Sequence, residues 1–422
     1  MGIATPETLQ DIRAMLDNDD IINRAGHPLM EIGSDHYFVD ENDLQNVSDT
    51  ERGMYLWTRH YPADDIGDWY YAYQAIMLAN VALESLERVG AVDEQKGPLK
   101  GEALFIRAFQ HYCLAQVFAP PYLVDGDNSR EGIPLKLSSN FEEKTQRASV
   151  KEVYDQIEED LNTALSLLPD VTMIKTRPSK AAVYALKARM YLAMRSYDRA
   201  FDMADKALGL YSTVLDLNTL DLESQSPFPL LHEEIMYACY GATGFVLSSL
   251  YANVSPELYK LYKDGDLRKE AYFYEKTEDR IGLKGDYIGI YSTVFPGLCT
   301  DEMYLIRAEI SIRKGEVEKG LADLNKLLAF KYRSDSFQGY GDMEMTEALD
   351  LVLTERRKQL LFRGLRWSDL KRLNQEGREI TLYRFADDGQ TVIATLPPND
   401  PRYIFLIPDN VVHLSGIKQN IR

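Results

Sequence analysis

The sequence predicts a mainly α-helical fold, an array of tetratricopeptide-like helix pairs with an irregular, loop-rich region and a few short strands. Three observations predict it. Apolar residues recur at helical spacing through most of the 422 residues. Two pairs of predicted helices share small residues at matching positions, as helical repeats do. From about 211 to 298 the sequence becomes irregular and rich in Gly, Ser, Pro and aromatic residues.

The helical spacing defines the elements in order, and prolines that follow the second and third predicted helices mark where these end. The predicted helices span 69–89, 99–118, 150–168, 179–194, 197–208, 301–314, 317–330, 347–363 and 367–373. We assign them to one domain, residues 1–422, with helix pairs at about 69–118, 150–208, 301–330 and 347–374.

Two of these pairs resemble tetratricopeptide units. The pair at 179–208 carries Ala188 in its first helix and Ala200 in its second. The pair at 301–330 repeats this layout with Ala308, and its turn falls at Gly315. Small residues at such positions let paired helices approach closely.

Two short segments are typical of strands rather than helices. They are 270–276 and 390–397, and Gly389 is expected in the turn before the second. A long insert without regular structure in a compact helical protein is usually functional or disordered. The many aromatic residues of the 211–298 insert argue against disorder, so we expect it to hold a ligand.

The charge balance argues against nucleic-acid and anionic-lipid partners. The chain holds 47 Lys and Arg against 66 Asp and Glu, a net charge of −19, and such a field repels polyanions. The three cysteines form no CxxC motif, so we expect them to be small buried apolar residues. These cysteines are Cys113, Cys239 and Cys299.

No common catalytic or metal-binding motif is present. HExxH, P-loop and GxSxG patterns are missing from the sequence, and its six His residues lack metal-ligand spacing. Neighbouring acidic residues such as Asp64 and Asp65 are expected to be solvated surface charge rather than a glycosidase pair. We therefore predict no catalytic residue, no metal and no cofactor.

The most basic stretch of the chain is ERRKQLLFRGLRWSDLKRLN, which begins at Glu355. On a helix, Arg356 and Arg357 border an apolar stripe, and Glu355 lies on the other face. A guanidinium beside an apolar stripe needs a buried carboxylate partner, and we expect Glu309 or Glu102 to supply it. The stripe consists of Leu349, Leu353, Leu360 and Gly364.

Five stretches of the sequence have counterparts, in the same order, in one known family. They are WYYAYQAIMLAN, GEALFIRAFQHYCLAQVFAPPYL, DGDLRKEAYF, LTERRKQLLFRGLRWSDLKRLN and YIFLIPDNVVHLSGIKQN. Together they resemble the SusD/RagB family, surface lipoproteins of Gram-negative bacteria that capture nutrients. The resemblance spans about residues 7–422 and places Trp69 and Trp367 in the core.

The resemblance implies a SusD-like α/α superhelix whose variable loops bind a glycan without any chemistry. The partner implied is a SusC-like TonB-dependent outer-membrane receptor, to which the glycan is delivered. The location implied is the outer membrane, through an N-terminal lipid on a cysteine that we expect outside these 422 residues. Two alternatives remain: an oligopeptide ligand for the same fold, and a tetratricopeptide-type protein–protein adaptor.

A glycan site needs aromatic faces that stack on sugar rings and polar groups that bind hydroxyls. We expect these in the loops, at about 34–68 and 211–298, and Trp57 is the best single candidate. The predicted ligand-binding residues are Trp57, Tyr37, Asp40, Arg59, Tyr240, Phe245, Tyr251 and Tyr291.

Overall fold

Helices dominate the protein, which we describe from a computed structural model that covers residues 6–64, 66–242, 244–284, 287–290 and 293–422. The helices are α1 (Leu9–Leu16), α2 (Asp19–Ile22), α3 (Leu29–Ile32), α4 (Glu41–Leu44), α5 (Asp49–Tyr55), α6 (Gly67–Arg88), α7 (Asp93–Phe118), α8 (Val150–Leu167), α9 (Lys180–Ala193), α10 (Tyr197–Leu210), α11 (Pro256–Tyr259), α12 (Leu267–Tyr272), α13 (Thr300–Arg313), α14 (Val317–Leu328), α15 (Met345–Gln359), α16 (Arg366–Asn374) and α17 (Asp409–Ser415).

The strands are short and form antiparallel pairs. The pairs are β1 (Tyr37–Phe38) with β6 (Asn253–Val254), β2 (Glu131–Pro134) with β3 (Arg147–Ser149), β4 (Ile235–Tyr237) with β10 (Leu298–Cys299), β5 (Gly241–Ala242) with β9 (Thr293–Val294), β7 (Phe273–Thr277) with β8 (Arg280–Leu283), and β11 (Leu382–Phe385) with β12 (Val392–Leu396).

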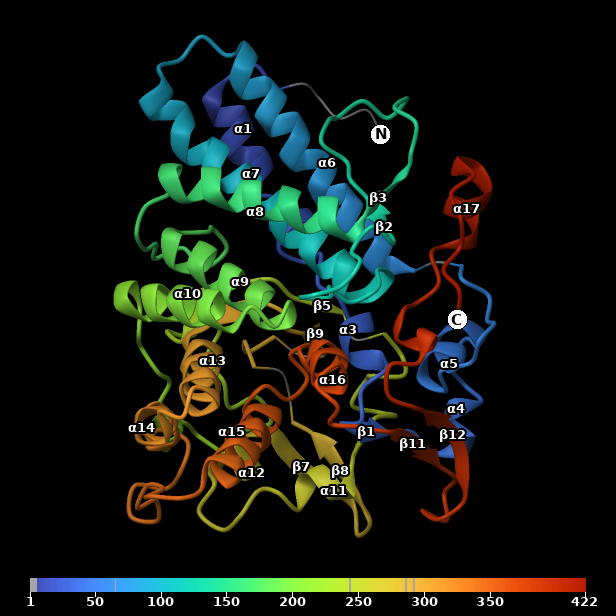
Figure 1. The fold of residues 1–422 in the computed structure, drawn as a ribbon, viewed down its shortest axis with the longest axis vertical. Coiled ribbons are helices and arrows are strands. Elements are labelled where there is room, and N and C mark those ends of the chain that lie inside the picture. The colour runs from blue at the N-terminus through green and yellow to red at the C-terminus, as the bar shows by residue number, and fades with distance from the viewer. Residues whose placement is uncertain (1–5, 65, 243, 285–286, 291–292) are drawn as a thin grey trace.

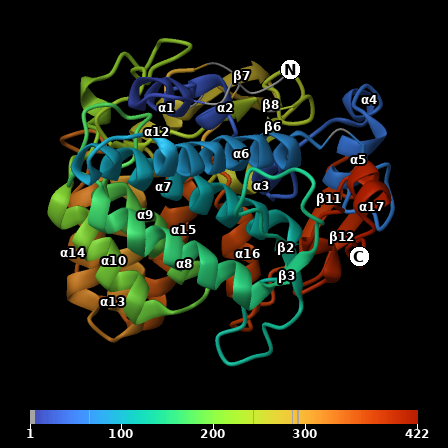
Figure 2. The same ribbon diagram turned by 90° about the horizontal axis from the view of Figure 1, so that it is seen from above.

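The long helices stack side by side and form one side of the molecule. Helices α6, α7 and α8 lie next to one another, and α9, α10, α13 and α14 continue the stack (Figure 2). Strands β11 and β12 and helices α4, α5 and α17 lie together on the other side (Figure 1). The mainly helical fold with a few short strands agrees with the fold class that the sequence predicts.

Small residues allow the close helix packing that the repeats predict. A Cβ atom on Gly320 of α14 would lie 2.5 Å from Cγ1 of Ile312 and 2.7 Å from the carbonyl oxygen of Ala308, both in α13. Gly315 has φ +82° in the turn between these helices. Ala188 and Ala200 are fully buried where α9 and α10 meet.

Several predicted element boundaries differ from the structure, most clearly those of α7 and of the 270–276 segment. Helix α7 begins at Asp93 rather than at residue 99 and contains Pro98, which removes one hydrogen bond without ending the helix. The predicted strand at 270–276 is divided, since α12 extends to Tyr272 and β7 begins only at Phe273. The side chain of Asp266 caps α12 by accepting the Arg268 N–H, which makes this segment helical.

The basic stretch that begins at Glu355 is buried and ion-paired, but its partners differ from those expected. Arg356 pairs with Asp369, and Arg357 pairs with Asp35. Glu309 instead binds Arg372. The partners of Arg357 and Arg372 come from elements that are distant in the chain, whereas Asp369 lies within the stretch itself, where α16 turns back on α15.

The faces of α15 also differ from the expected stripe. Glu355 is buried rather than on an open face, and it accepts hydrogen bonds from Arg268 and Lys358 at 2.6 and 2.7 Å. Ala348 and Val352 are the fully buried apolar residues of this helix, whereas Leu349 and Leu353 are half-buried. The expected partner Glu102 pairs with Arg13 of α1 at 2.6 Å.

The C-terminal tail is fixed to the end of α7 by side-chain amides. Gln419 accepts the Ile407 N–H at 2.8 Å and donates to the Ile407 carbonyl at 2.7 Å. Asn420 donates to the carbonyls of Phe118 and Phe405. The buried ring of Trp367 donates its N–H to the Tyr403 carbonyl at 3.1 Å, so the tail and α16 share one core.

All three cysteines are buried and free, as expected. Burial raises the pKa of the Cys239 thiol to about 12, so it stays protonated. A search of the described residues finds no helix whose length and hydropathy suit a membrane span.

Candidate ligand-binding site

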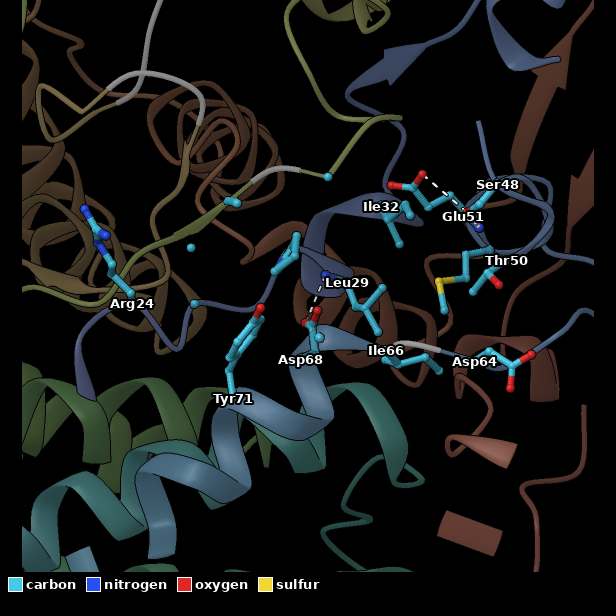
Figure 3. A pocket seen from close by; sticks show the side chains of 17 residues that line it. Arg24, Leu29, Ile32, Ser48, Thr50, Glu51, Asp64, Ile66, Asp68 and Tyr71 are labelled. Carbon is cyan, nitrogen blue, oxygen red and sulfur yellow. Dashed lines mark hydrogen bonds between the residues drawn. The ribbon is translucent and has the colours of Figure 1, made fainter. Parts of the chain in front are cut away.

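A pocket of about 440 Å³ opens where the N-terminal segment, the start of α6 and the insert around β5 meet (Figure 3). Three carboxyl groups line it, those of Glu51, Asp64 and Asp68, against the single guanidinium of Arg24. We call it the acidic pocket. Both loop regions expected to hold the ligand contribute to it, residues 48–67 from the first and 241–244 from the second.

Close backbone contact between the two segments shapes this pocket. The Gly26 N–H donates to the Tyr240 carbonyl at 3.0 Å, and both Gly26 and Gly241 line the pocket. A Cβ atom on Gly26 would lie 2.2 Å from the Gly241 nitrogen, so only glycine fits there. The wall between N-terminal segment and insert therefore depends on residues without side chains.

Glu51 connects α5 to the insert. Ser48 caps α5 by accepting the Glu51 N–H, and the Glu51 carboxylate accepts the Phe245 N–H at 2.9 Å. The Phe245 ring itself is 67% exposed. This hydrogen bond holds an exposed aromatic ring beside the acidic pocket.

Asp68 lies at the base of the pocket and is only 3% exposed (Figure 3). Its Oδ2 accepts the Leu29 N–H at 3.1 Å and lies 3.7 Å from Nδ1 of His27. Burial raises the pKa of Asp68 to about 8 and lowers the pKa of His27 to about 4. Both side chains are therefore mainly uncharged at neutral pH, and Asp68 carries a proton that it can donate.

Tyr71 supplies a second exposed aromatic ring. It extends from the first turns of α6 into the pocket and is 56% exposed (Figure 3). Trp69, two residues earlier, is buried and packs against Tyr73 and Phe118. One face of this helix therefore packs in the core, and another lines the pocket. An aromatic face close to hydrogen-bonding carboxyls suits a ligand that presents both apolar and hydroxyl surfaces.

Trp57 and Tyr37 do not present a face to a ligand, contrary to the prediction. Trp57 is fully buried, its ring N–H donates to the Gly33 carbonyl, and the Arg384 guanidinium lies 4.4 Å from its ring. Tyr37 is also buried and donates its hydroxyl to Ile32. Arg384 of β11 covers both rings. The sequence gives no sign of this contact, because Arg384 lies more than 300 residues further along the chain.

Asp40 and Arg59 lie outside the acidic pocket and hold segments together. Asp40 pairs with Arg280 at 2.8 Å. The exposed Arg59 donates to the Arg422 carbonyl at 2.6 Å. Both contacts join distant parts of the chain.

The predicted residues of the insert have different surroundings. Tyr240 is buried, and its backbone forms part of the wall beside Gly26. Tyr251 is half-buried and packs against the core. Phe245 presents its ring to solvent beside the acidic pocket, and Tyr291 lies outside the described residues.

The sequence reasoning missed most of the polar lining. Glu51 and Asp68 were not considered, and Asp64 was expected to be plain surface charge. A signal for Tyr71 exists in WYYAY, because Tyr71 lies two residues after the buried Trp69 and so falls on another face of the helix. Among the described residues, no group of His, Cys, Asp or Glu is arranged to hold a metal ion.

Comparison with known proteins agrees with this architecture. Residues 5–192 match the family model SusD-like_3, described as "Starch-binding associating with outer membrane". The chain is 23% identical over 374 residues to SusD-like protein P2 of Formosa agariphila, a match that covers 72% of this chain and 71% of that protein.

Solved structures share the fold along the whole chain. A putative sugar binding protein from Bacteroides vulgatus superposes with a TM-score of 0.79 at 20% identity, over 99% of both chains. A laminarin binding SusD-like protein superposes with a TM-score of 0.70 at 19% identity, over 97% of this chain and 98% of that one. The family model, the relatives and the shared fold together show that this chain is similar to SusD-like proteins.

Proposed function

We propose that this protein binds an oligosaccharide in the acidic pocket. The observation that carries the proposal is that the exposed ring of Tyr71 lines one cavity together with the carboxyl groups of Glu51, Asp64 and Asp68. Phe245, whose ring is also exposed, is joined to this cavity through the hydrogen bond from its backbone to Glu51. Sugar rings offer C–H faces for the aromatic side chains and hydroxyls for the carboxyls. The pocket volume of about 440 Å³ suits a few sugar units rather than a folded partner.

The protonation of the pocket favours an uncharged sugar. The neutral Asp68 can donate to a sugar oxygen, while Glu51 and Asp64 accept from hydroxyls. An anionic sugar would face two carboxylates and a chain of net charge −19. Neutral glycans are therefore the substrate class that we assign to this pocket.

The carboxyl groups serve binding rather than catalysis in this proposal. Hydrolysis of a glycosidic bond requires two carboxyl groups on either side of that bond. Asp68 is almost completely buried at the base of the pocket, and the Glu51 carboxylate accepts the Phe245 N–H. We assign no catalytic step to either group.

Similarity to SusD-like proteins supports a location and a partner. The matching family model is described as associating with the outer membrane, and a SusD-like protein of the same fold binds laminarin. We propose that this chain is one SusD-like domain, held at the outer-membrane surface by an N-terminal lipid. It would deliver its glycan to a TonB-dependent, SusC-like outer-membrane receptor.

A binding screen tests the function. Isothermal titration with laminari-oligosaccharides, malto-oligosaccharides and unrelated oligopeptides should give a measurable Kd for at least one neutral glycan and none for the peptides. Binding of peptides alone would replace this proposal with oligopeptide capture. Binding of neither class would leave the adaptor function as the better account.

A further inference from the structure

A second pocket, of about 420 Å³, lies between the loop after α7, the α9–α10 turn, the end of α16 and residues 399–404. We call it the basic pocket, because its lining includes the cationic side chains of Arg130, Arg195 and Lys371. None of these three forms an ion pair within the described part of the chain. This is unusual in a protein with an excess of 19 negative charges.

Arg195 presents one edge of its guanidinium without a partner. It has φ +60° in the turn between α9 and α10, and its Nη1 approaches the Gln375 carbonyl at 3.4 Å. Its Nε is buried and donates to no described residue. The guanidinium of Arg195 lines the basic pocket, so an acceptor placed in the pocket would contact it.

Lys371 and Gln375 also line the pocket. Lys371 is 6% exposed and donates to the Gln116 carbonyl at 2.5 Å. Burial lowers the pKa of Lys371 to about 7, so a nearby anion would favour its charged form. Gln375 has neither its amide nitrogen nor its amide oxygen paired among the described residues.

Several buried arginines of this protein pair with carboxylates. Arg107 pairs with Asp160 at 2.7 Å, and Arg189 pairs with Glu302 at 2.6 Å. Arg384 is buried and donates to backbone carbonyls instead. A cation without a partner is costly to remove from water, so a ligand that supplies the counter-charge would be favoured in the basic pocket.

The acidic residues near the basic pocket do not cancel its charge. Asp400 accepts three hydrogen bonds from Arg402, which lower its pKa and neutralise it locally. Glu376 is bound by Arg313 at 2.9 Å, and burial raises the pKa of Glu376 to about 7. Glu376 also faces Arg195, which favours its ionised form, whereas no carboxylate of the described residues pairs with Arg130 or Lys371.

We propose that the basic pocket binds a small carboxylate-bearing molecule of the size of a uronic acid. A carboxylate in the pocket can accept charge-assisted hydrogen bonds from the guanidinium of Arg195. The amide of Gln375 and the guanidinium of Arg130 then hold hydroxyls or the second face of the anion. This site is distinct from the acidic pocket and takes the opposite class of ligand.

Glucuronate and glucose test the proposal, because they differ only at C6. Titration of the whole protein with sodium D-glucuronate should give binding that glucose does not show. R195Q should weaken glucuronate binding at least about tenfold, as expected for the loss of a charge-assisted pair. R130Q removes an exposed side chain and should weaken it while the melting temperature stays unchanged.

R24Q is the matched control, since it makes the same change at the acidic pocket. It should leave the Kd for glucuronate within twofold of the wild-type value. Equal binding of glucose and glucuronate, or no glucuronate binding, would overturn the proposal. Wild-type affinity for glucuronate in both R195Q and R130Q would also overturn it. So would a loss of glucuronate affinity in R24Q with no loss in R195Q and R130Q.

Discussion

The Nε of Arg356 donates to Oδ2 of Asp369 at 2.8 Å, and both residues are buried. These residues lie on α15 and α16, within the basic stretch that begins at Glu355. Asp369 is shared with Arg372, and the two guanidiniums lower its pKa to about 2. The stretch is therefore part of the frame and is not a binding surface for an anionic polymer.

Arg356→Ala should lower the free energy of unfolding by about 3–5 kcal/mol, because it leaves Asp369 as a partly unpaired buried charge. Urea denaturation measures this loss. Glycan affinity of the folded fraction should not change. The control is Arg24→Ala, which breaks an exposed ion pair with Asp20. It should leave the midpoint of urea denaturation unchanged. Lost affinity with an unchanged midpoint in Arg356→Ala would show that this residue belongs to a ligand site.

Much of the fold could be predicted because its signals are local. Helical spacing placed the array, and small residues such as Ala188 and Ala308 correctly indicated close helix pairs. The partner of Arg356 could not be predicted, because which carboxylate reaches it depends on the angle at which α15 and α16 meet. The strand predicted at 270–276 is only partly right. Its first three residues belong to α12, because the cap from Asp266 outweighs the strand preference of the aromatic residues.

The predicted loop regions and the predicted residues relate differently to the acidic pocket. Both expected loop regions do line the acidic pocket. Trp57 was the strongest single candidate, yet Arg384 stacks on it and buries it. An aromatic residue in a loop carries no local sign of whether a side chain from the other end of the chain will cover it.

Trp57→Ala should act on stability and not on binding. Removal of a fully buried ring that contacts Arg384 should cost about 3–5 kcal/mol of unfolding free energy. Thermal denaturation measures this change, and titration of the folded fraction should give the wild-type glycan affinity. A variant that melts normally but no longer binds glycan would return Trp57 to the ligand site.

Asp68→Asn should change how stability depends on pH. The folded pKa of Asp68, about 8, lies above the ordinary value near 4, so its favourable contribution is complete at low pH. That contribution is lost as pH rises toward 8. The Asn variant should equal the wild type near pH 4 and exceed it by about 2–4 kcal/mol at pH 7. Denaturation curves at both pH values measure the difference. A constant difference between pH 4 and pH 8 would mean that Asp68 is ionised throughout.

Gly26→Ala should separate the N-terminal segment from the insert. The new Cβ would collide with the backbone of Gly241, at an expected cost of about 1–3 kcal/mol, and glycan affinity should fall as the pocket wall moves. Gly90→Ala is the matched control, because nothing lies within 4 Å of a Cβ at that position. Chemical denaturation and titration of both variants check this. Wild-type affinity in a folded Gly26→Ala protein would show that this wall does not shape the site.

The most direct test of the central claim is the affinity of Tyr71→Ala and Phe245→Ala for the tightest-binding neutral glycan of the screen. Both rings are exposed, so both variants should fold and melt like the wild type. Each should bind about tenfold more weakly, as expected for the loss of one stacked ring worth about 1–1.5 kcal/mol. Tyr383→Ala, which removes an exposed ring on β11 that does not line the acidic pocket, should bind like the wild type. Wild-type affinity in both pocket variants would contradict glycan binding at the acidic pocket.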